Sequence, residues 1–167
     1  MPPPAAEACS TQNEEVQPYP ETPAGRPEVT RAVARGVVRH LVQAGMAPIL
    51  EVPLPNGRRA DIMALGPDGR ITIIEVKSCA ADYLTDRKWR FYADFCDRFG
   101  FAVAADFPLE LLPPEPGVLV ADAYDAAEIR PLQPFTLAAA RRRVLQLRFA
   151  RLAALRSLGV EAAEPFA

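Results

Sequence analysis

The sequence has few of the residues that build disulfide frameworks or histidine-based metal centres. Its 167 residues include three cysteines and one histidine, with no CxxC pair and no Cys/His ligand spacing. We therefore expect neither a disulfide scaffold nor a structural zinc, and a reducing cytoplasmic setting fits best. Because no run approaches the roughly 18 apolar residues of a membrane span, and no basic segment precedes an apolar one at the N-terminus, neither membrane insertion nor secretion is expected.

A strong charge of one sign is also missing, since the formal net charge is −2. The chain has no overall basic field, so a polyanion would have to meet a local cluster of Lys and Arg. Half of the residues are hydrophobic and 24% are charged, as in soluble globular proteins. We expect a disordered Pro-rich tail over residues 1–27, which holds seven prolines, and one domain over residues 28–160.

Hydrophobic periodicity predicts an α/β domain. A helix is expected from Glu28 or Val29 to Gly45, followed by three strand-like runs at 47–54, 58–65 and 70–77 with turns between them. A second helix is expected over 81–98, short strands over 100–106 and 117–122, and an Arg- and Ala-rich helix over 136–158 with Thr136 as its cap. This order predicts a mixed central sheet covered on both faces.

Three charged residues interrupt the apolar strands. In ITIIEVK, the alternation of a strand places Glu75 and Lys77 on one face, about 7 Å apart. The turn at 66–69 brings the preceding strand alongside in an antiparallel pair, so Asp61 is expected across from the Ile74 to Glu75 level. The two carboxylates and the amine therefore face one point.

Two carboxylates in a half-buried site repel each other, and a cation or a shared proton normally removes that cost. Oxygen ligands without His or Cys suit a hard ion, Mg²⁺ or Mn²⁺. Such a site is typical of phosphodiester hydrolysis, with Lys77 placed to position or deprotonate water and to neutralise the phosphate. The plain alternative is a strand-edge cluster in which Lys77 is the salt-bridge partner of the acids, because D-x(n)-ExK is a short and common pattern.

The same residues carry a resemblance to a known family. Asp61, the hairpin and Glu75-Val76-Lys77 after a leading helix resemble the core of the PD-(D/E)xK nuclease superfamily, which has the restriction-endonuclease-like fold. More narrowly, GRRADIMAL, IIEVKSCAADYLTDRKWRFYADFCDRFGFAV and GVLVADA are similar to the MmcB family of bacterial DNA repair proteins. The resemblance covers roughly residues 27 to 158 and implies an α-β-β-β-α-β core flanked by helices.

The resemblance also implies roles for individual residues. It makes Asp61 and Glu75 metal ligands, the Val76 carbonyl a further ligand, and Lys77 the catalytic lysine. Many superfamily members add a glutamate from the first helix, where this chain instead carries arginines. The candidates for an additional acid are Glu28 at the start of that helix, Glu51 on the first strand, and Asp82 just after Lys77.

Two functions remain open at this point. The first is a DNA repair protein with Mg²⁺-dependent deoxyribonuclease activity, and the second is a catalytically inactive nuclease-fold module that binds DNA or repair-protein partners. Arg141, Arg148 and Arg151 fall near one line of the last helix and are candidate phosphate contacts, although a solvated face gives the same pattern. A small metabolic metalloenzyme is disfavoured because nothing resembles a phosphate-cradling glycine loop.

Overall fold

A computed structural model describes residues 26–78 and 89–160 of the chain. Helices and strands follow one another in the order α1 (Arg26–Gln43), β1 (Ala47–Pro53), β2 (Arg59–Leu65), β3 (Ile71–Lys77), the 3₁₀ helix η1 (Trp89–Phe95), β4 (Arg98–Val103), the 3₁₀ turn η2 (Leu109–Leu111), β5 (Gly117–Ala121), β6 (Ala126–Arg130), β7 (Gln133–Pro134) and α3 (Ala139–Ser157).

The strands form one mixed sheet in the order β1-β2-β3-β4-β5-β6, and β7 pairs with the start of β4. The first three strands make an antiparallel meander, β3, β4 and β5 run parallel, and β6 returns antiparallel to β5. The α/β class and the mixed sheet are therefore confirmed. The Pro-containing strand β1 lies at the edge, where the missing N–H of proline costs least.

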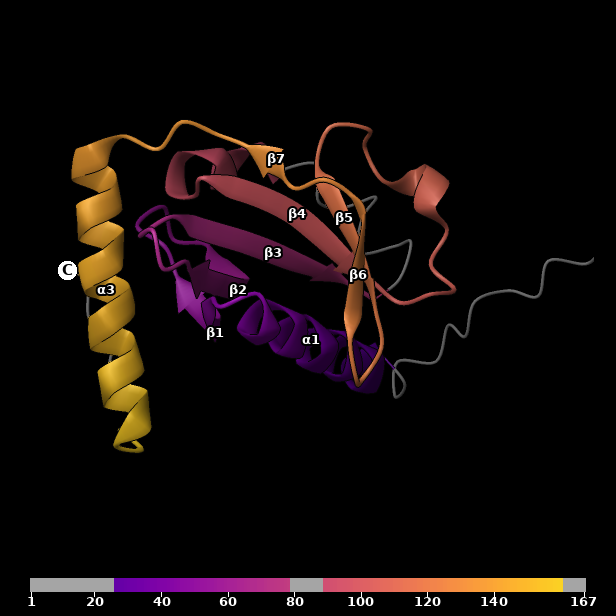
Figure 1. Cartoon of the computed structure of the whole chain (residues 1–167), viewed down its shortest axis with the longest axis horizontal. Helices are drawn as coiled ribbons and strands as arrows, with labels where there is room; N and C mark the ends of the chain where they lie inside the picture. Colours follow the sequence, from indigo (N-terminus) through magenta and orange to yellow (C-terminus); the bar gives the residue numbers. More distant parts are fainter. Residues whose placement is uncertain (1–25, 79–88, 161–167) are drawn as a thin grey trace, which may run out of the picture.

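The sheet separates two apolar clusters. Below it in Figure 1, α1 packs Val33, Val37 and Leu41 against side chains of the strands that include Ile62 and Ile74. The opposite cluster joins η1 and α3 to the sheet through the buried residues Trp89, Tyr92, Phe95, Phe99, Leu145, Phe149 and Leu152. Burial of both faces explains why β3 is buried along its whole length and why its charged residues are enclosed with it.

Glycine ends α1 as its position predicts. Gly45 has a φ of 75°, and the N–H groups of Gly45 and Met46 donate to the carbonyls of Val42 and Leu41 at 2.9 Å. This pairing is the Schellman arrangement, which requires a left-handed residue just after the helix and is least strained with glycine there.

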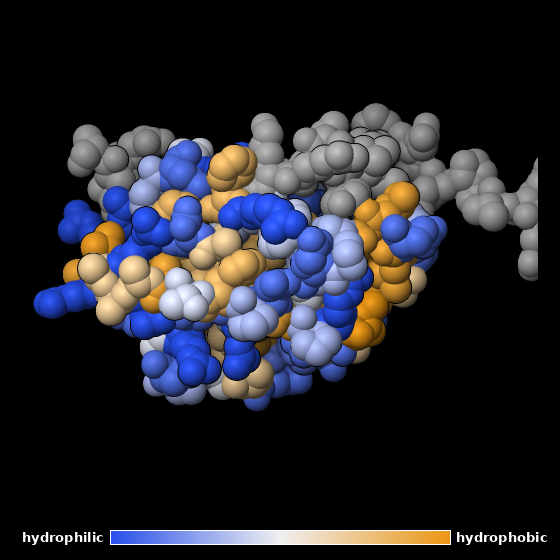
Figure 2. All heavy atoms as spheres, turned by 90° about the horizontal axis from the view of Figure 1, so that it is seen from above, coloured by the Kyte–Doolittle hydropathy of each residue, from blue (hydrophilic) through white to orange (hydrophobic). Residues whose placement is uncertain are grey.

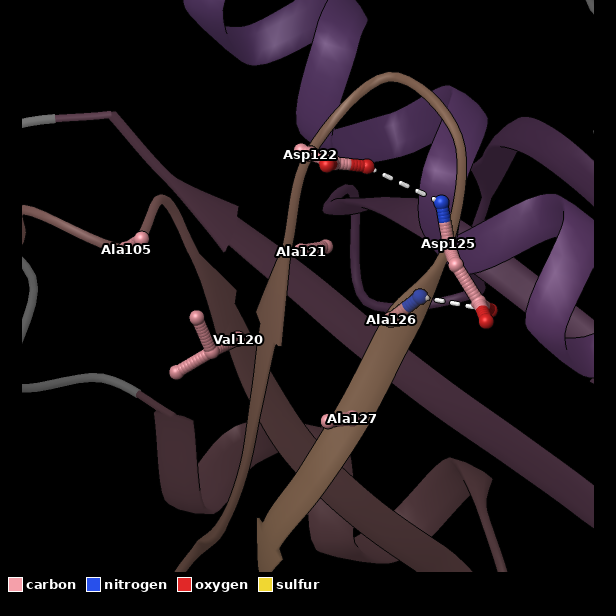
Figure 3. Close-up of a pocket in the computed structure, with 7 residues that line it drawn as sticks. All are labelled: Ala105, Val120, Ala121, Asp122, Asp125, Ala126 and Ala127. Atoms are coloured by element: carbon pink, nitrogen blue, oxygen red, sulfur yellow. Dashed lines mark hydrogen bonds between the residues drawn. The ribbon is translucent and has the colours of Figure 1, made fainter.

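The turn between β5 and β6 packs closely on α1 (Figure 3). Asp122 Oδ1 accepts hydrogen bonds from the N–H groups of Tyr124 at 2.7 Å and Asp125 at 3.0 Å, which fixes the turn. A Cβ on Gly36 would meet the carbonyl oxygens of Asp122 and Asp125, the latter at 2.5 Å. Only glycine at position 36 therefore lets the helix come this close.

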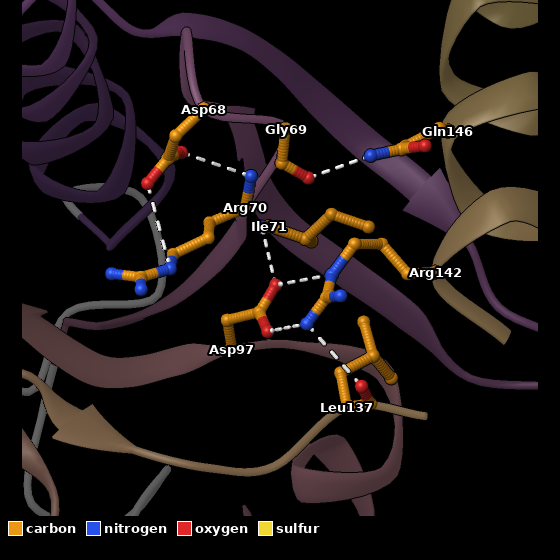
Figure 4. Close-up of polar contacts among 8 residues, drawn as sticks. All are labelled: Asp68, Gly69, Arg70, Ile71, Asp97, Leu137, Arg142 and Gln146. Atoms are coloured by element: carbon orange, nitrogen blue, oxygen red, sulfur yellow. Dashed lines mark hydrogen bonds and ion pairs between the residues drawn. The ribbon is translucent and has the colours of Figure 1, made fainter. Parts of the chain in front are cut away.

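Side-chain hydrogen bonds tie α3 to the start of β3 and to the turn before it (Figure 4). Arg142 donates to both carboxylate oxygens of the buried Asp97, and the Ile71 N–H donates to Asp97 Oδ2 at 2.9 Å. Gln146 Nε2 donates to the Gly69 carbonyl at 2.7 Å. The helix is thus held to the sheet by polar contacts as well as by its apolar stripe.

Several predicted boundaries are wrong. The helix α1 begins at Arg26 and includes Pro27 in its first turn, where a backbone N–H has no partner within the helix and proline's lack of one costs nothing. The rest of the predicted tail lies outside the described residues. Of the helix predicted over 81–98, the part before Trp89 also lies outside them, η1 is a 3₁₀ helix, and Arg98 already belongs to β4. Thr136 does not cap α3, which begins at Ala139.

Most of the surface seen from above is hydrophilic, with hydrophobic residues visible between the charged ones (Figure 2). Within residues 26–78 and 89–160, no helix combines the length and apolar character that crossing a bilayer requires.

The strands β6 and β7 were not predicted, because AAEIR has only one large apolar residue and β7 is two residues long.

The Asp97 contacts generate a prediction about stability. Burial opposes ionisation of Asp97, but hydrogen bonds from Arg142 and from the Ile71 N–H outweigh it and hold its pKa below the usual range. The ionised carboxylate therefore stabilises the fold above the ordinary aspartate pKa of about 3.9, and this contribution is lost as the pH falls through the lowered value. Asp97→Asn should lower the free energy of unfolding by about 1–2 kcal/mol at neutral pH.

Urea denaturation of wild type and Asp97→Asn at neutral pH and in acid would measure this effect. The difference between the two proteins should shrink in acid, whereas the exposed control Glu110→Gln should match wild type throughout. A difference that is independent of pH would contradict the role of the Asp97 charge.

Candidate functional site

Three acids, Glu51, Asp61 and Glu75, lie on neighbouring strands where the pairing of the sheet is interrupted. The β1 to β2 register pairs Leu50 with Ile62 and Val52 with Ala60, so Glu51 stands opposite Asp61 without being paired to it. The β2 to β3 register runs from Leu65 opposite Ile71 to Ile62 opposite Ile74 and ends there. If the same register is extended by one residue beyond the pair Ile62 and Ile74, Asp61 lies opposite Glu75.

The alternation of β1 and β2 reverses at this interruption. Glu51 has a φ of 52°, a left-handed conformation that is strained for any residue other than glycine. Before it, Ile49 packs on the cluster shared with α3, and after it Val52 packs on that same cluster, although one face should hold every second residue. Ala60 also belongs to this cluster, whereas Ile62, two residues later on β2, belongs to the cluster under α1, so the regular alternation of β2 fails here as well.

Each carboxylate replaces a hydrogen bond that the ladder has lost. Glu75 Oε1 accepts from the Asp61 N–H at 3.1 Å, and Asp61 Oδ2 accepts from the Val76 N–H at 2.8 Å. Glu75 is only 4% exposed, whereas Asp61 is half-buried. The strands are therefore joined here by side chains, and both acids are fixed in position by backbone donors.

Burial makes both acids reluctant to ionise. It raises the pKa of Asp61 against the opposing effects of the Val76 N–H and the Lys77 charge. Burial first, and the Asp61 charge second, raise the pKa of Glu75 to about 8. Near neutral pH the pair therefore shares a proton, as two buried carboxylates do when no cation separates them.

Lys77 supplies the positive charge of the site. Its side chain is buried, 6% exposed, and its charge favours the ionised form of both acids. Its Nζ lies 5.8 Å from the centroid of the Phe101 ring, which stands beside Glu75 on β4. The structure thus brings Asp61, Glu75 and Lys77 together, as the strand pattern predicts.

Tyr92 was not predicted at this site. Its hydroxyl lies 3.3 Å from the Arg59 carbonyl oxygen and also within hydrogen-bonding reach of Glu75. Its single proton, when donated to Glu75, favours the ionised carboxylate. In the sequence Tyr92 reads only as one of the apolar residues of a helix, so periodicity gives no signal for this contact.

The candidates for an additional acid lie in different places. Glu51 is on β1 opposite Asp61, raises the pKa of Asp61 by its charge, and forms an ion pair with Arg59. Glu28 is exposed in the first turn of α1, and Asp82 lies outside the described residues. Among residues 26–78 and 89–160, no group of three or more His, Cys, Asp or Glu is close enough to hold a metal ion. A cation would therefore need carbonyl, water or substrate oxygens beside Asp61 and Glu75.

The arginines predicted to contact DNA have different surroundings on α3. Arg141 Nη1 contacts Asp94 Oδ1 at 3.1 Å, and its guanidinium lies over the Phe95 ring. Arg148 is half-buried, and Arg151 is exposed. Their role in DNA binding stays a prediction, and within residues 26–78 and 89–160 Arg151 is exposed and takes part in no ion pair.

An open mixed sheet, with the half-buried Asp61 beside the buried Glu75 and with Lys77 at the end of β3, defines an α/β protein with a candidate functional site. The family model described as DNA repair protein MmcB-like matches residues 17–164, and the chain belongs to this family. A solved structure of a protein of unknown function from Silicibacter pomeroyi is 50% identical, with a TM-score of 0.71 over 77% of this chain and 88% of the other. No curated protein matches the chain.

The shared proton predicts how stability responds to pH without metal. Because the folded pKa of Glu75 lies above its unfolded value of about 4.3, its contribution is fully present below that value and is lost as the pH rises through about 8. Glu75→Gln keeps an oxygen for the Asp61 N–H and cannot ionise. We expect the variant to gain stability relative to wild type between about pH 5 and pH 9, since each pKa unit corresponds to about 1.4 kcal/mol.

Denaturation in the presence of a chelator would measure this gain. The exposed Glu128→Gln on β6 is the matched control and should follow wild type. If Glu75→Gln also runs parallel to wild type across this range, Glu75 does not hold a proton in the folded protein.

Proposed function

We propose that this DNA repair family member is a nuclease of the PD-(D/E)xK type with a restriction-endonuclease-like fold, and that it hydrolyses DNA phosphodiesters with Mg²⁺ or Mn²⁺. The observation that carries the proposal is the meeting of Asp61, Glu75 and Lys77 at a break in the sheet. A purely structural salt bridge would not need two mutually repelling carboxylates beside one buried lysine.

The donor set fits a hard divalent cation. The Asp61 and Glu75 carboxylates, with the Val76 carbonyl, offer only oxygen, which Mg²⁺ and Mn²⁺ prefer. Burial raises the pKa of both acids, and a cation bound between them would favour their ionised forms. When bound, the ion would polarise the scissile phosphate and lower the pKa of a coordinated water.

The remaining chemistry falls to the residues of the chain. The Val76 N–H holds Asp61 in place, and the Asp61 N–H holds Glu75, so neither carboxylate has to reorient to meet a ligand. Lys77 lies on the same strand as Glu75 and its charge acts on both acids, so its ammonium can hold a phosphate oxygen as negative charge develops. The buried position of the lysine strengthens that contact, because water screens it little.

The order of elements supports the same proposal. A leading helix, an antiparallel hairpin that carries the acids, and a parallel strand β4 after β3 agree with the α-β-β-β-α-β core that the resemblance implies. Of the second helix of that core, predicted over 81–98, residues 81–88 lie outside the described residues, and Trp89–Phe95 form the 3₁₀ helix η1. Glu51 is a better additional acid than Glu28, because it lies in the same row across the sheet as Asp61 and Glu75.

A second function is favoured by one observation. Both carboxylates already accept backbone hydrogen bonds that repair the interrupted ladder, a structural role that an inactive descendant of a nuclease would keep. In that case the protein binds DNA or repair-protein partners without cutting. Cleavage assays separate the two functions directly.

Lys77→Met is the sharpest test of catalysis. Methionine keeps most of the buried aliphatic volume but removes the charge, so the fold should survive. We expect Mg²⁺-dependent cleavage of single-stranded, duplex, flap or junction DNA to fall by at least about a hundredfold, as for loss of one electrostatic group in a hydrolytic site. DNA affinity should change little.

Glu128→Gln again serves as the control and should cleave like wild type. Unchanged cleavage by Lys77→Met would remove the lysine from the mechanism. Absence of cleavage by wild type on all four substrates with both Mg²⁺ and Mn²⁺ would support the non-catalytic alternative.

The exposure of Arg151 predicts a phosphate contact on α3. If it contacts DNA, Arg151→Gln should reduce the slope of log affinity against log salt by about 0.9. Arg141→Gln should change the slope less, because its guanidinium is held by Asp94. Fluorescence anisotropy with labelled duplex DNA at several salt concentrations measures both slopes, and an unchanged slope for Arg151→Gln would remove this face from the interface.

A further inference from the structure

The exposed side of α1 contains a groove that the nuclease proposal does not use. Its volume is about 340 Å³, and it is lined by Arg31, Ala34, Arg35, Val38, Arg39 and Leu50. It lies between the helix and the edge strand β1, on the side of the sheet away from η1 and α3.

Three arginines form one row along this groove. Arg31, Arg35 and Arg39 are spaced by four residues, so they follow one another at a rise of about 6 Å on the same side of the helix. Arg31 Nε donates to the Pro27 carbonyl at 3.0 Å, a contact within the helix. Within the part of the chain that the structure describes, none of the three takes part in an ion pair.

Apolar side chains form the floor beside the arginines. Ala34 and Val38 are half-buried, and Leu50 of β1 is 41% exposed. Val42, four residues after Val38 on the same helix, is 56% exposed. Its neighbours Val37 and Leu41 are buried against the sheet, so the exposed apolar positions continue beyond what the fold itself covers.

The charge of the surrounding domain is opposite to that of the whole chain. The described residues hold 17 of the 19 Lys and Arg but 13 of the 21 Asp and Glu, which gives them a formal charge of +4. The net charge of −2 arises because the other residues are acidic. The described residues as a whole therefore carry charge of the same sign as the arginine row.

We propose that this groove docks an acidic, amphipathic segment of a partner protein. Leucine-like side chains on one face of the segment would cover Ala34, Val38 and Leu50, and Asp or Glu beside them would pair with Arg31, Arg35 and Arg39. A DNA backbone fits less well, because a phosphate placed over the apolar floor loses water and gains no partner there. This proposal goes beyond the nuclease activity and does not depend on it.

A displayed random peptide library, selected on the full-length protein, tests the groove. The selected sequences should combine Leu, Ile or Phe at helical spacing with Asp or Glu. Synthetic copies, titrated by fluorescence anisotropy, should bind at least tenfold more weakly to Arg35→Gln/Arg39→Gln and to Leu50→Ser than to wild type. Arg98→Gln/Arg143→Gln removes the same charge from exposed arginines elsewhere and should bind the peptides like wild type.

Two results would overturn the proposal. One is selection of peptides that bind the wild type and Arg35→Gln/Arg39→Gln equally, or of none with an acidic and apolar pattern. The other is a loss of duplex DNA affinity in Arg35→Gln/Arg39→Gln, with a salt slope smaller by about two and no competition by the peptides, which would make the groove a DNA surface. Mg²⁺-dependent cleavage by the same variants reports on the nuclease proposal separately.

Discussion

The interruption of the sheet at Glu51, Asp61 and Glu75 is the constraint on which the site depends. A buried strand must satisfy its backbone N–H groups, and here carboxylates satisfy two of them where the regular pairing stops. The left-handed backbone of Glu51 reverses the alternation of β1 side chains between the two faces of the sheet, at the level of Asp61 and Glu75. This irregularity strains the backbone and removes two acids from water, and it fixes two carboxylates in place between the packed faces of the sheet.

The helix α3 supports this arrangement from the edge. Arg156 donates to the carbonyls of Leu50 and Glu51, the latter at 2.9 Å, and so holds the edge strand where its backbone is strained. Arg142 and Gln146 hold the other end of the helix to the start of β3 and the turn before it. Several arginines of α3 are therefore structural, although a sequence cannot distinguish a solvated arginine from one that reaches a carbonyl.

The core of the fold was predictable from the sequence because alternation and turn residues state it directly. The meander, the edge position of β1 and the glycine stop of α1 follow from prolines, glycines and apolar periodicity. The convergence of Asp61 with Glu75 follows from the same alternation. Two features were not predictable from the sequence. The reversed alternation at Glu51 arises from an irregular backbone, and the contact between Tyr92 and Glu75 arises from the packing of η1 on the sheet.

Net charge was the least informative property of the sequence, and the reason is spatial. Summing −2 over the chain hides a described domain of +4, in which arginines of α3 are partly used by the fold while those of α1 line an open groove. The two basic surfaces also differ in shape, since the α1 row borders a groove with an apolar floor, whereas Arg151 lies on α3 four residues after the exposed Leu147. A groove with an apolar floor beside charge favours a protein segment over a phosphate backbone, because non-specific binding of DNA draws on charge. The two surfaces therefore present different shapes to a binding partner.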